Sequence, residues 1–296
     1  MNIAILQSEL DELQDTPTLF DQYNFRARKE ALDFTAVIEK IDIENRLDIV
    51  GLLNLQQQAR ALGERLRAIN ASIAQYWHDR LKSERPSPQA LRESLRPYTD
   101  YVSRRWGQPH YGYENLDFLL DEILLPRPHP QASLTAENGM VRYEPTPASV
   151  IFELTERVRF TANDVFYDLG SGLGKVTLLV HLLTRVRCVG VEYQPDFCAY
   201  ADQQAHRLKL KNLNYLNIDA RYADYAAGTV FFFFNPFGGT IFPTVLERLH
   251  LEAQQREIRI CSYGSSSQPL SEFSWLERIP PLSDDSAALA IFRSHA

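Results

Sequence analysis

The first part of the chain alternates apolar and polar residues with the period of an α-helix. One apolar stripe consists of Phe20, Tyr23, Ala27, Ala31, Phe34, Ile38 and Ile41, and a second consists of Leu55, Ala59, Leu62, Leu66, Ile69, Ile73 and Tyr76. Spacings of three and four place each stripe on one helix face. We therefore predict two long amphipathic helices, packed against each other as an antiparallel hairpin. A dimerisation coiled coil or a partner-binding arm is the alternative interpretation.

Proline and other turn-forming residues divide the chain after these two stripes. Ser87-Pro88 opens a further helix that Pro97 breaks or restarts, and residues 113–125 predict one more short helix. Residues 126–139 read PRPHPQASLTAENG, which is rich in turn formers and poor in apolar residues. The pattern predicts a helical N-terminal domain over residues 1–125, a linker over 126–140 and a second domain over 141–296.

In the second half the rhythm changes to strand, helix, strand, helix. The predicted strands are residues 165–169, 187–191, 214–218, 229–234, 258–262, 273–279 and 287–292, and the predicted helices are 175–184, 197–210 and 241–250. Such alternation is typical of an α/β fold whose mostly parallel sheet carries helices on both faces. The last two strands leave no room for a helix between them, so an antiparallel hairpin should close one edge of the sheet.

Composition and charge narrow the function classes. The chain has 296 residues, is 45% hydrophobic, and carries 31 basic against 38 acidic residues, for a net charge of −7. Acidic residues are in excess on both sides of Pro145. The average field therefore repels polyanions, and nucleic acid is not favoured as a partner. Cys188, Cys198 and Cys261 lack the spacing of a metal site or a disulfide framework, so we expect no metal.

Nothing in the chain predicts membrane insertion. The sequence MNIAILQSELDELQD becomes acidic early and lacks the basic and apolar regions of a signal peptide. The apolar run of residues 230–234 is far shorter than the roughly 20 residues that span a bilayer. We expect a cytoplasmic protein.

A glycine-rich loop comes directly after the first predicted strand of the second half. The sequence DLGSGLG places Asp168 two positions before Gly170, followed by Ser171, Gly172 and Gly174 at the start of a helix. Glycines permit a sharp turn and close approach of a ligand, and the helix N-terminus offers free N–H groups. An acidic residue at this position suits a cationic ligand group, whereas a dinucleotide pyrophosphate would favour a neutral one. The alternative role for Asp168 is a turn-capping carboxylate.

Two more acidic residues lie at the ends of the next two strands. Glu192 ends the strand of VGVE, where its carboxylate could accept hydrogen bonds from two ribose hydroxyls. Asp219 in NIDA lies where an adenine amino group could donate, with the Ala220 N–H nearby for a ring nitrogen. The alternatives are a solvated strand-end charge for Glu192 and a turn-forming role for Asp219.

The motifs DLGSGLG, VGVE and NIDA together resemble the class I S-adenosylmethionine-dependent methyltransferases. The resemblance covers about the last 155 residues and implies a Rossmann-like, seven-stranded sheet with S-adenosylmethionine as cofactor. It implies cofactor contacts from Asp168, Gly170, Ser171, Gly172, Gly174, Glu192, Asp219 and Ala220. It says little about the methyl acceptor.

The fourth strand ends in Asn235, Pro236 and Phe237, the candidate catalytic residues, and Asn235 should also contact the cofactor. Amino-methylating relatives often carry Asp/Asn-Pro-Pro-Tyr/Phe here. This chain has one proline, and its aromatic residue comes one place early. This arrangement, with FYDLGSGLG, looks more like the non-SET histone-lysine and related protein-lysine methyltransferases. In them a loop before the first strand covers the cofactor, which assigns Tyr143 and Thr146 to the cofactor carboxylate. The alternative is that Pro145 and Pro147 simply start a helix.

The predicted function is methyl transfer to a protein side chain of the lysine type. The alternatives are a small-molecule methyltransferase, an RNA methyltransferase, or a non-catalytic S-adenosylmethionine-binding interaction module. The N-terminal helices would recognise the acceptor or pair two subunits as a homodimer.

Overall fold

The chain forms two compact units in the computed structural model. The structure describes residues 2–42, 48–99, 104–105, 108–109, 114–235, 237–265, 267–281 and 289–295. One unit comprises Met1–Arg80 and Leu95–Ile123, and the other comprises Leu81–Ser94 and Leu124–Ala296. The predicted domain limits at residues 125 and 140 stay a prediction. Within the described residues, no helix has the length and hydrophobicity needed to cross a bilayer.

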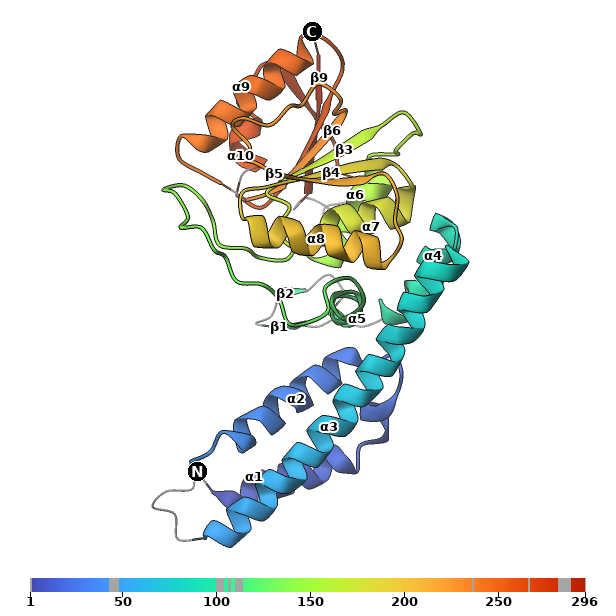
Figure 1. The fold of residues 1–296 in the computed structure, drawn as a ribbon, viewed down its shortest axis with the longest axis vertical. Helices are drawn as coiled ribbons and strands as arrows, with labels where there is room; N and C mark the ends of the chain where they lie inside the picture. Colours follow the sequence, from blue (N-terminus) through green and yellow to red (C-terminus); the bar gives the residue numbers. More distant parts are fainter. Residues whose placement is uncertain are drawn as a thin grey trace. The chain divides into compact units, whose positions relative to one another are not determined.

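The first unit is helical (Figure 1). Its elements are α1 (Ile3–Gln14), a 3₁₀ turn (Pro17–Phe20), α2 (Phe25–Glu39), α3 (Ile49–Asp79), a second 3₁₀ turn (Arg96–Tyr98), β1 (Arg104–Arg105), β2 (Gln108–Pro109) and α5 (Glu114–Leu124). The π-helical turn (Arg80–Glu84) and α4 (Pro88–Leu95), which follow α3 in the chain, belong almost entirely to the second unit. A core of Leu10, Leu19, Ala31, Ile38, Leu52, Leu55, Ala59, Leu62 and Leu66 joins α1, α2 and α3. The two long predicted helices thus exist and pack together, with α1 added to their core.

The buried face of α3 departs from the predicted stripe in its second half. Up to Leu66 the predicted positions are buried, but beyond it Asn70, Ala74 and Trp77 are buried while Tyr76 is 59% exposed. The predicted stripe repeats every 3.5 residues, whereas a straight α-helix has 3.6 residues per turn. The contact face therefore turns by about 20° per heptad, or roughly 60° over three heptads, which is more than half of the 100° between successive residues. By the end of α3 the buried position is thus Trp77 in place of Tyr76.

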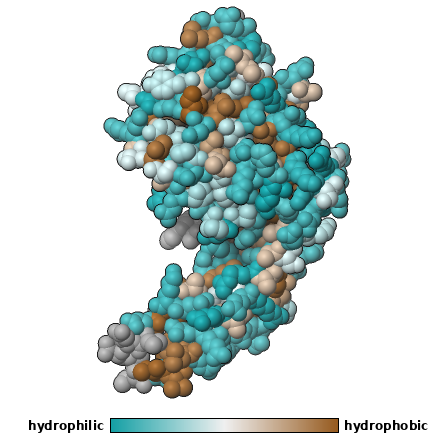
Figure 2. Space-filling view, in the orientation of Figure 1, coloured by the Kyte–Doolittle hydropathy of each residue, from teal (hydrophilic) through white to brown (hydrophobic). Residues whose placement is uncertain are grey.

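Part of the helical unit's surface is apolar. Figure 2 shows a mostly hydrophilic face with a hydrophobic patch beside the start of α3. There Ile49, Val50 and Leu53 are 46%, 80% and 49% exposed. The first turns of α3 thus present apolar side chains outside the unit's own core.

The second unit is an α/β sandwich, as predicted. Its elements are α6 (Ala148–Arg157), β3 (Val165–Leu169), α7 (Lys175–Thr184), β4 (Arg187–Glu192), α8 (Pro195–Arg207), β5 (Leu213–Asn217), β6 (Val230–Phe234), α9 (Ile241–Ala253), β7 (Arg259–Tyr263), α10 (Ser267–Leu270), β8 (Leu276–Ile279) and β9 (Leu289–Ser294). The sheet order is β5-β4-β3-β6-β7-β9-β8, parallel from β5 to β7. Strand β9 runs antiparallel to both β7 and β8. This confirms the seven-stranded Rossmann-like fold and its C-terminal hairpin.

Helices cover both faces of this sheet, with α6, α7 and α8 on one side and α9 and α10 on the other (Figure 1). Because successive side chains of a strand point to opposite faces, central strands are apolar throughout. Phe231 and Phe233 pack on the α9 side with Val245 and Leu249. From β3 the chain continues to β4 and β5 on one side of the sheet, and it then returns to β6 on the other side of β3. The strand order therefore reverses between β3 and β6. Such a switch point favours a ligand site at the carboxyl ends of these strands.

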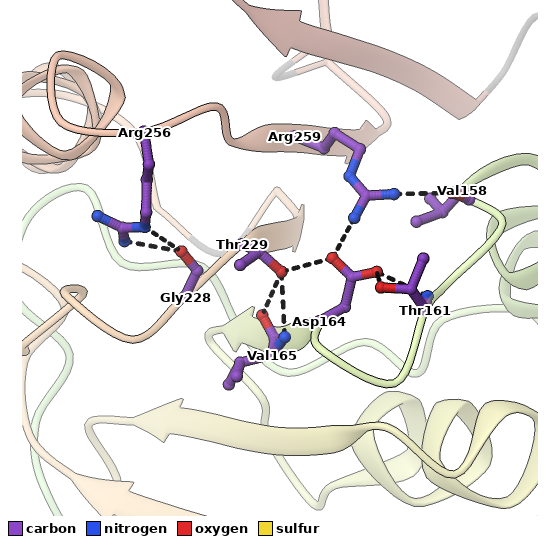
Figure 3. A network of polar contacts seen from close by, with 8 residues as sticks. All are labelled: Val158, Thr161, Asp164, Val165, Gly228, Thr229, Arg256 and Arg259. Atoms are coloured by element: carbon purple, nitrogen blue, oxygen red, sulfur yellow. Dashed lines mark hydrogen bonds and ion pairs between the residues drawn. The ribbon is translucent and has the colours of Figure 1, made fainter.

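A polar network closes the opposite end of the sheet (Figure 3). The Asp164 carboxylate, just before β3, accepts hydrogen bonds from the Thr161 N–H at 2.7 Å and the Thr229 hydroxyl at 2.8 Å. Arg259 of β7 donates to the same carboxylate and, at 2.8 Å, to the Val158 carbonyl. Burial alone would raise the pKa of Asp164, but these hydrogen bonds outweigh it and lower that pKa. The network ties the start of β3 to β6 and β7.

Candidate active site

A cavity of about 890 Å³ lies at the carboxyl ends of β3, β4 and β6. The predicted residues that line it are Tyr143, Gly170, Gly172, Glu192, Asp219, Ala220, Asn235 and Phe237. A smaller hollow of about 20 Å³ is lined by Tyr143, Thr146, Asp168, Gly170 and Ser171, among others. Gly174 lines neither space, and Pro236 lies outside the described residues.

The glycine loop turns between β3 and α7. The N–H groups of Gly170 and Ser171 both donate to the Val191 carbonyl, at 2.8 and 3.0 Å, which holds the loop against β4. Gly172 has φ of +52°, and a Cβ there would lie 2.3 Å from the Tyr143 ring. Any side chain at position 172 would therefore be strained and would displace Tyr143. Gly174, with φ of +86°, is the N-cap residue of α7.

Glu192 ends β4 with its carboxylate held by backbone donors. Its Oε2 accepts from the Gly172 N–H and its Oε1 from the Gln194 N–H, both at 2.8 Å. The side chain is buried, and burial raises its pKa while these N–H groups and that of Tyr193 oppose the shift. The carboxylate of β4 and the glycine loop after β3 thus form one rigid unit.

Asp168 lies on β3 beside this pair. It is 3% exposed, and its Oδ2 has no hydrogen-bond partner within the part of the chain that the structure describes. Burial, and then the nearby charge of Glu192, raise the pKa of Asp168 well above its usual range. The Ser171 hydroxyl is likewise buried without a partner among the described groups. An unsatisfied buried carboxylate is costly, so a ligand that supplied a donor or a positive charge here would be stabilised by Asp168.

Asp219, after β5, is engaged by a neighbouring arginine. Both carboxylate oxygens accept from the Arg221 side chain, the shortest contact being 2.6 Å, and Arg221 also pairs with Glu137 at 2.6 Å. Burial would raise the pKa of Asp219, but the hydrogen bonds and charge of Arg221 lower it instead. Asp219 is thus ionised and fixed, and the Arg221 bridge connects it to the segment before α6.

The segment predicted as a linker contributes walls of the cavity that the sequence pattern did not predict. The Gln194 amide makes a reciprocal pair with the Leu134 backbone, donating to its carbonyl at 2.8 Å and accepting from its N–H at 2.9 Å. Met140 forms a β-bridge with Phe237. The lining includes His129, Pro130, Gln131, Ala132, Leu134 and Ala136. Turn-rich composition masked this role, because these contacts are long-range and leave no periodic signal.

The candidate catalytic residues lie after β6. Asn235 lines the cavity with φ of +43°, a left-handed conformation that asparagine tolerates. Phe237 is 8% exposed, packs with Met140 in the core, and also borders the cavity. Upstream of β3, Pro147 is the N-cap residue of α6, which agrees with the alternative that these prolines start a helix. The Tyr143 ring lies edge-on against the Phe197 ring, with 5.8 Å between the ring centroids. Pro147 thus starts a helix, and the cofactor role of Tyr143 stays a prediction.

These features fit an adenosyl ligand that also carries a cationic group. Asp168 supplies an unpartnered buried carboxylate oxygen, as far as the described residues extend, and Glu192 supplies a second carboxylate at the end of the neighbouring strand. The apolar part of the lining includes Leu173, Val191, Phe197, Ile218 and Ile241. Ligand sites typically combine such an apolar wall with a few fixed polar groups.

Comparisons with known proteins bear on the enzyme class of the chain. Residues 138–231 match the family model described as "Histone methylation protein DOT1". This segment contains the glycine loop, Glu192, Asp219 and strands β3 to β5. The match and the observed sheet confirm the resemblance to class I S-adenosylmethionine-dependent methyltransferases and the predicted enzyme class. Among curated proteins, none matches the chain.

Several solved structures are similar to part of the chain. An RNA methyltransferase from Salinibacter ruber, in complex with S-adenosyl-L-homocysteine, shares 20% identity with a TM-score of 0.41, covering 51% of this chain and 92% of that one. A SAM-dependent methyltransferase from Thiobacillus denitrificans shares 22% identity with a TM-score of 0.34, covering 40% and 49%. Precorrin-6y C5,15-methyltransferase from Geobacter metallireducens GS-15 shares 15% identity with a TM-score of 0.38, covering 54% and 94%. At these scores the likenesses add nothing to what the chain's own sheet order shows.

Proposed function

We propose that this class I methyltransferase uses S-adenosylmethionine to N-methylate a protein side chain of the lysine type. The observation that carries the cofactor assignment is the pair of buried carboxylates, Asp168 and Glu192, against the glycine loop. The match of residues 138–231 to the family model supports a protein acceptor.

The predicted cofactor-binding residues then have the following roles. Asp168 binds the ammonium of the methionine part, because its buried Oδ2 lacks a donor among the described residues. Glu192 accepts from ribose hydroxyls, while Asp219 and the Ala220 N–H bind the adenine edge. Ser171, Gly170 and Gly172 shape the turn, and Tyr143 and Thr146 serve the cofactor carboxylate.

The chain's part in the reaction is alignment and desolvation. When bound, the cofactor supplies a methyl group already activated on a sulfonium. Asn235, with Pro236 and Phe237, holds the acceptor amine in line, which reduces the entropic cost of the transfer. Burial favours the neutral amine, so hydrogen bonding to Asn235 suffices without a strong base. Gly174 fixes the start of α7 behind the loop.

Calorimetric titration with S-adenosylmethionine and S-adenosylhomocysteine tests the cofactor assignment. We expect micromolar binding that Gly172→Arg abolishes, because the new side chain would occupy the space of Tyr143 and the ligand. Folded wild-type protein that binds neither compound would refute the proposal. Circular dichroism and thermal unfolding of the variant control for misfolding.

Radiolabelled methyl transfer into cell lysate tests the acceptor class. Label that protease removes and nuclease leaves supports a protein acceptor, while the reverse would establish an RNA acceptor. Label in the low-molecular-weight fraction would establish a small molecule. Binding without any transfer would favour a non-catalytic module.

We further propose a cytoplasmic enzyme built from the predicted domains 1–125 and 141–296 with linker 126–140.

The exposed apolar residues Ile49, Val50 and Leu53 support pairing of subunits through the N-terminal helices. Light scattering measures the oligomeric state, and we expect the wild type to be a dimer and Val50→Glu to be a monomer. A monomeric wild type would leave acceptor recognition as the role of these helices.

A further inference from the structure

Strands β6 and β7 place their carboxyl ends side by side, and β6 leads directly into Asn235, which lines the cavity. Strands β6 and β7 are parallel neighbours, and Phe234 is paired with Tyr263 at the last position of both. Their rings lie 4.9 Å apart between centroids. The next residues along the chain, Asn235 after β6 and Gly264 with Ser265 after β7, are therefore held close together by the sheet register.

Gly264 makes room for the Asn235 side chain. It has φ of +89°, and a Cβ at this position would lie 2.3 Å from Asn235 Nδ2 and 2.7 Å from Oδ1. Real Cβ atoms do not approach so closely, and an L-residue with this φ is strained in any case. The absence of a side chain at position 264 thus defines where the Asn235 amide lies.

Ser265 makes a hydrogen bond to one edge of that amide. Its hydroxyl donates to Asn235 Oδ1 at 3.1 Å. The two edges of an amide have nearly the same shape, so only hydrogen bonding distinguishes the oxygen edge from the nitrogen edge. A bound amine needs the oxygen edge, because an amide nitrogen cannot accept its proton.

We propose that Gly264 and Ser265 are positioning residues that present the Asn235 oxygen to the amine in the cavity. This inference rests on the proposed function, and it assigns a role to a loop that lies outside the segment matched by the family model. Gly264 acts by leaving space, and Ser265 acts through one hydrogen bond. Neither residue is required to touch the cofactor.

Paired titrations with S-adenosylhomocysteine and sinefungin test this without a known acceptor. Sinefungin carries an amine-bearing carbon where the cofactor carries its methyl sulfonium, so its affinity relative to S-adenosylhomocysteine reports on groups that accept from an amine. We expect the wild type to favour sinefungin. Ser265→Ala and Gly264→Ala should each reduce that preference by about 3- to 10-fold, the scale of one hydrogen bond, while affinity for S-adenosylhomocysteine stays within about twofold. Ser265→Thr, which keeps the hydroxyl, should retain the preference.

Ser267→Ala is the matched control. Ser267 begins α10, directly after this loop, and its hydroxyl donates to the Ser262 carbonyl at 3.0 Å, so its removal should leave the preference unchanged. Equal preference in the wild type and Ser265→Ala, or no preference in the wild type, would overturn the positioning role. Failure of the wild type to bind S-adenosylhomocysteine would instead refute the proposed function.

Discussion

Two aspartates at opposite ends of strand β3 have opposite environments. Asp164 and Asp168 are both buried, at 6% and 3% exposure. Asp164 is satisfied by Thr161, Thr229 and Arg259, and its pKa is lowered. Asp168 keeps a buried oxygen without a described donor, and burial and Glu192 raise its pKa.

The difference separates a stabilising site from the proposed binding site within one strand. A buried carboxylate that is fully hydrogen-bonded strengthens the fold, whereas an unsatisfied one weakens it until a ligand provides the missing partner. Sheet topology gives the same division, because α/β folds bind ligands at the carboxyl ends of their strands. The hydrogen bonds of Asp164 thus stabilise the amino end of β3, while the unpartnered oxygen of Asp168 destabilises its carboxyl end.

The largest effect should come from Asp168→Asn. The amide cannot neutralise a cationic ligand group, so we expect affinity for S-adenosylhomocysteine to fall at least about 100-fold, the cost of removing one partner of a buried charge pair. Because the folded-state pKa of Asp168 is raised, its ionisation opposes folding once the pH exceeds the unfolded value. The variant should therefore melt at the same or a higher temperature near pH 7. Calorimetry and thermal unfolding measure both quantities, and a lower melting temperature would contradict the comparison.

Asp164→Asn should destabilise the fold and leave ligand binding unchanged. Losing the Arg259 pair and part of the hydrogen-bond network should cost about 2–3 kcal/mol of unfolding free energy, while ligand affinity stays unchanged. The folded-state pKa of Asp164 is lowered, so its contribution is present above the unfolded pKa of about 3.9 and is lost as pH falls through the folded value. Urea unfolding at pH 7 and pH 3 should show a smaller difference between variant and wild type at pH 3. An equal difference at both pH values would show that the Asp164 charge has no role.

The smallest effect concerns proton release on binding. In the free protein, Asp168 and Glu192 both have raised pKa values, and a cationic ligand group should lower them. Binding should therefore release protons, and affinity for S-adenosylhomocysteine should rise with pH above the ordinary carboxyl pKa of about 4, by at most about tenfold per pH unit for each proton released. Titration in two buffers of different ionisation enthalpy measures the release. Asp164→Asn should release the same amount as the wild type, and identical heats in both buffers would exclude the linkage.

Local patterns were sufficient to predict most of the fold. Strand β3 and helix α7 begin and end where the apolar runs and the glycine loop predicted, and the final hairpin closes the sheet edge. In the helical unit the stripe identified α2 and α3 but not the buried Arg28, whose guanidinium donates to Asn70 and to backbone carbonyls. Such an inward-pointing charge contradicts its local pattern and depends on partners distant in the sequence.

The sequence alone sufficed for the α/β alternation, the glycine loop and the strand-end acids, because hydrophobic period and turn chemistry act between near neighbours. The tertiary structure was needed to show that Asp164 is satisfied and that Asp168, among the described residues, is not. It was also needed for the pairing of Leu134 with Gln194 and for the hydrogen bond from Ser265 to Asn235. These contacts depend on strand order and register, which bring together residues that no local pattern links. The sequence therefore located the site, and the tertiary structure determined how its charges are balanced.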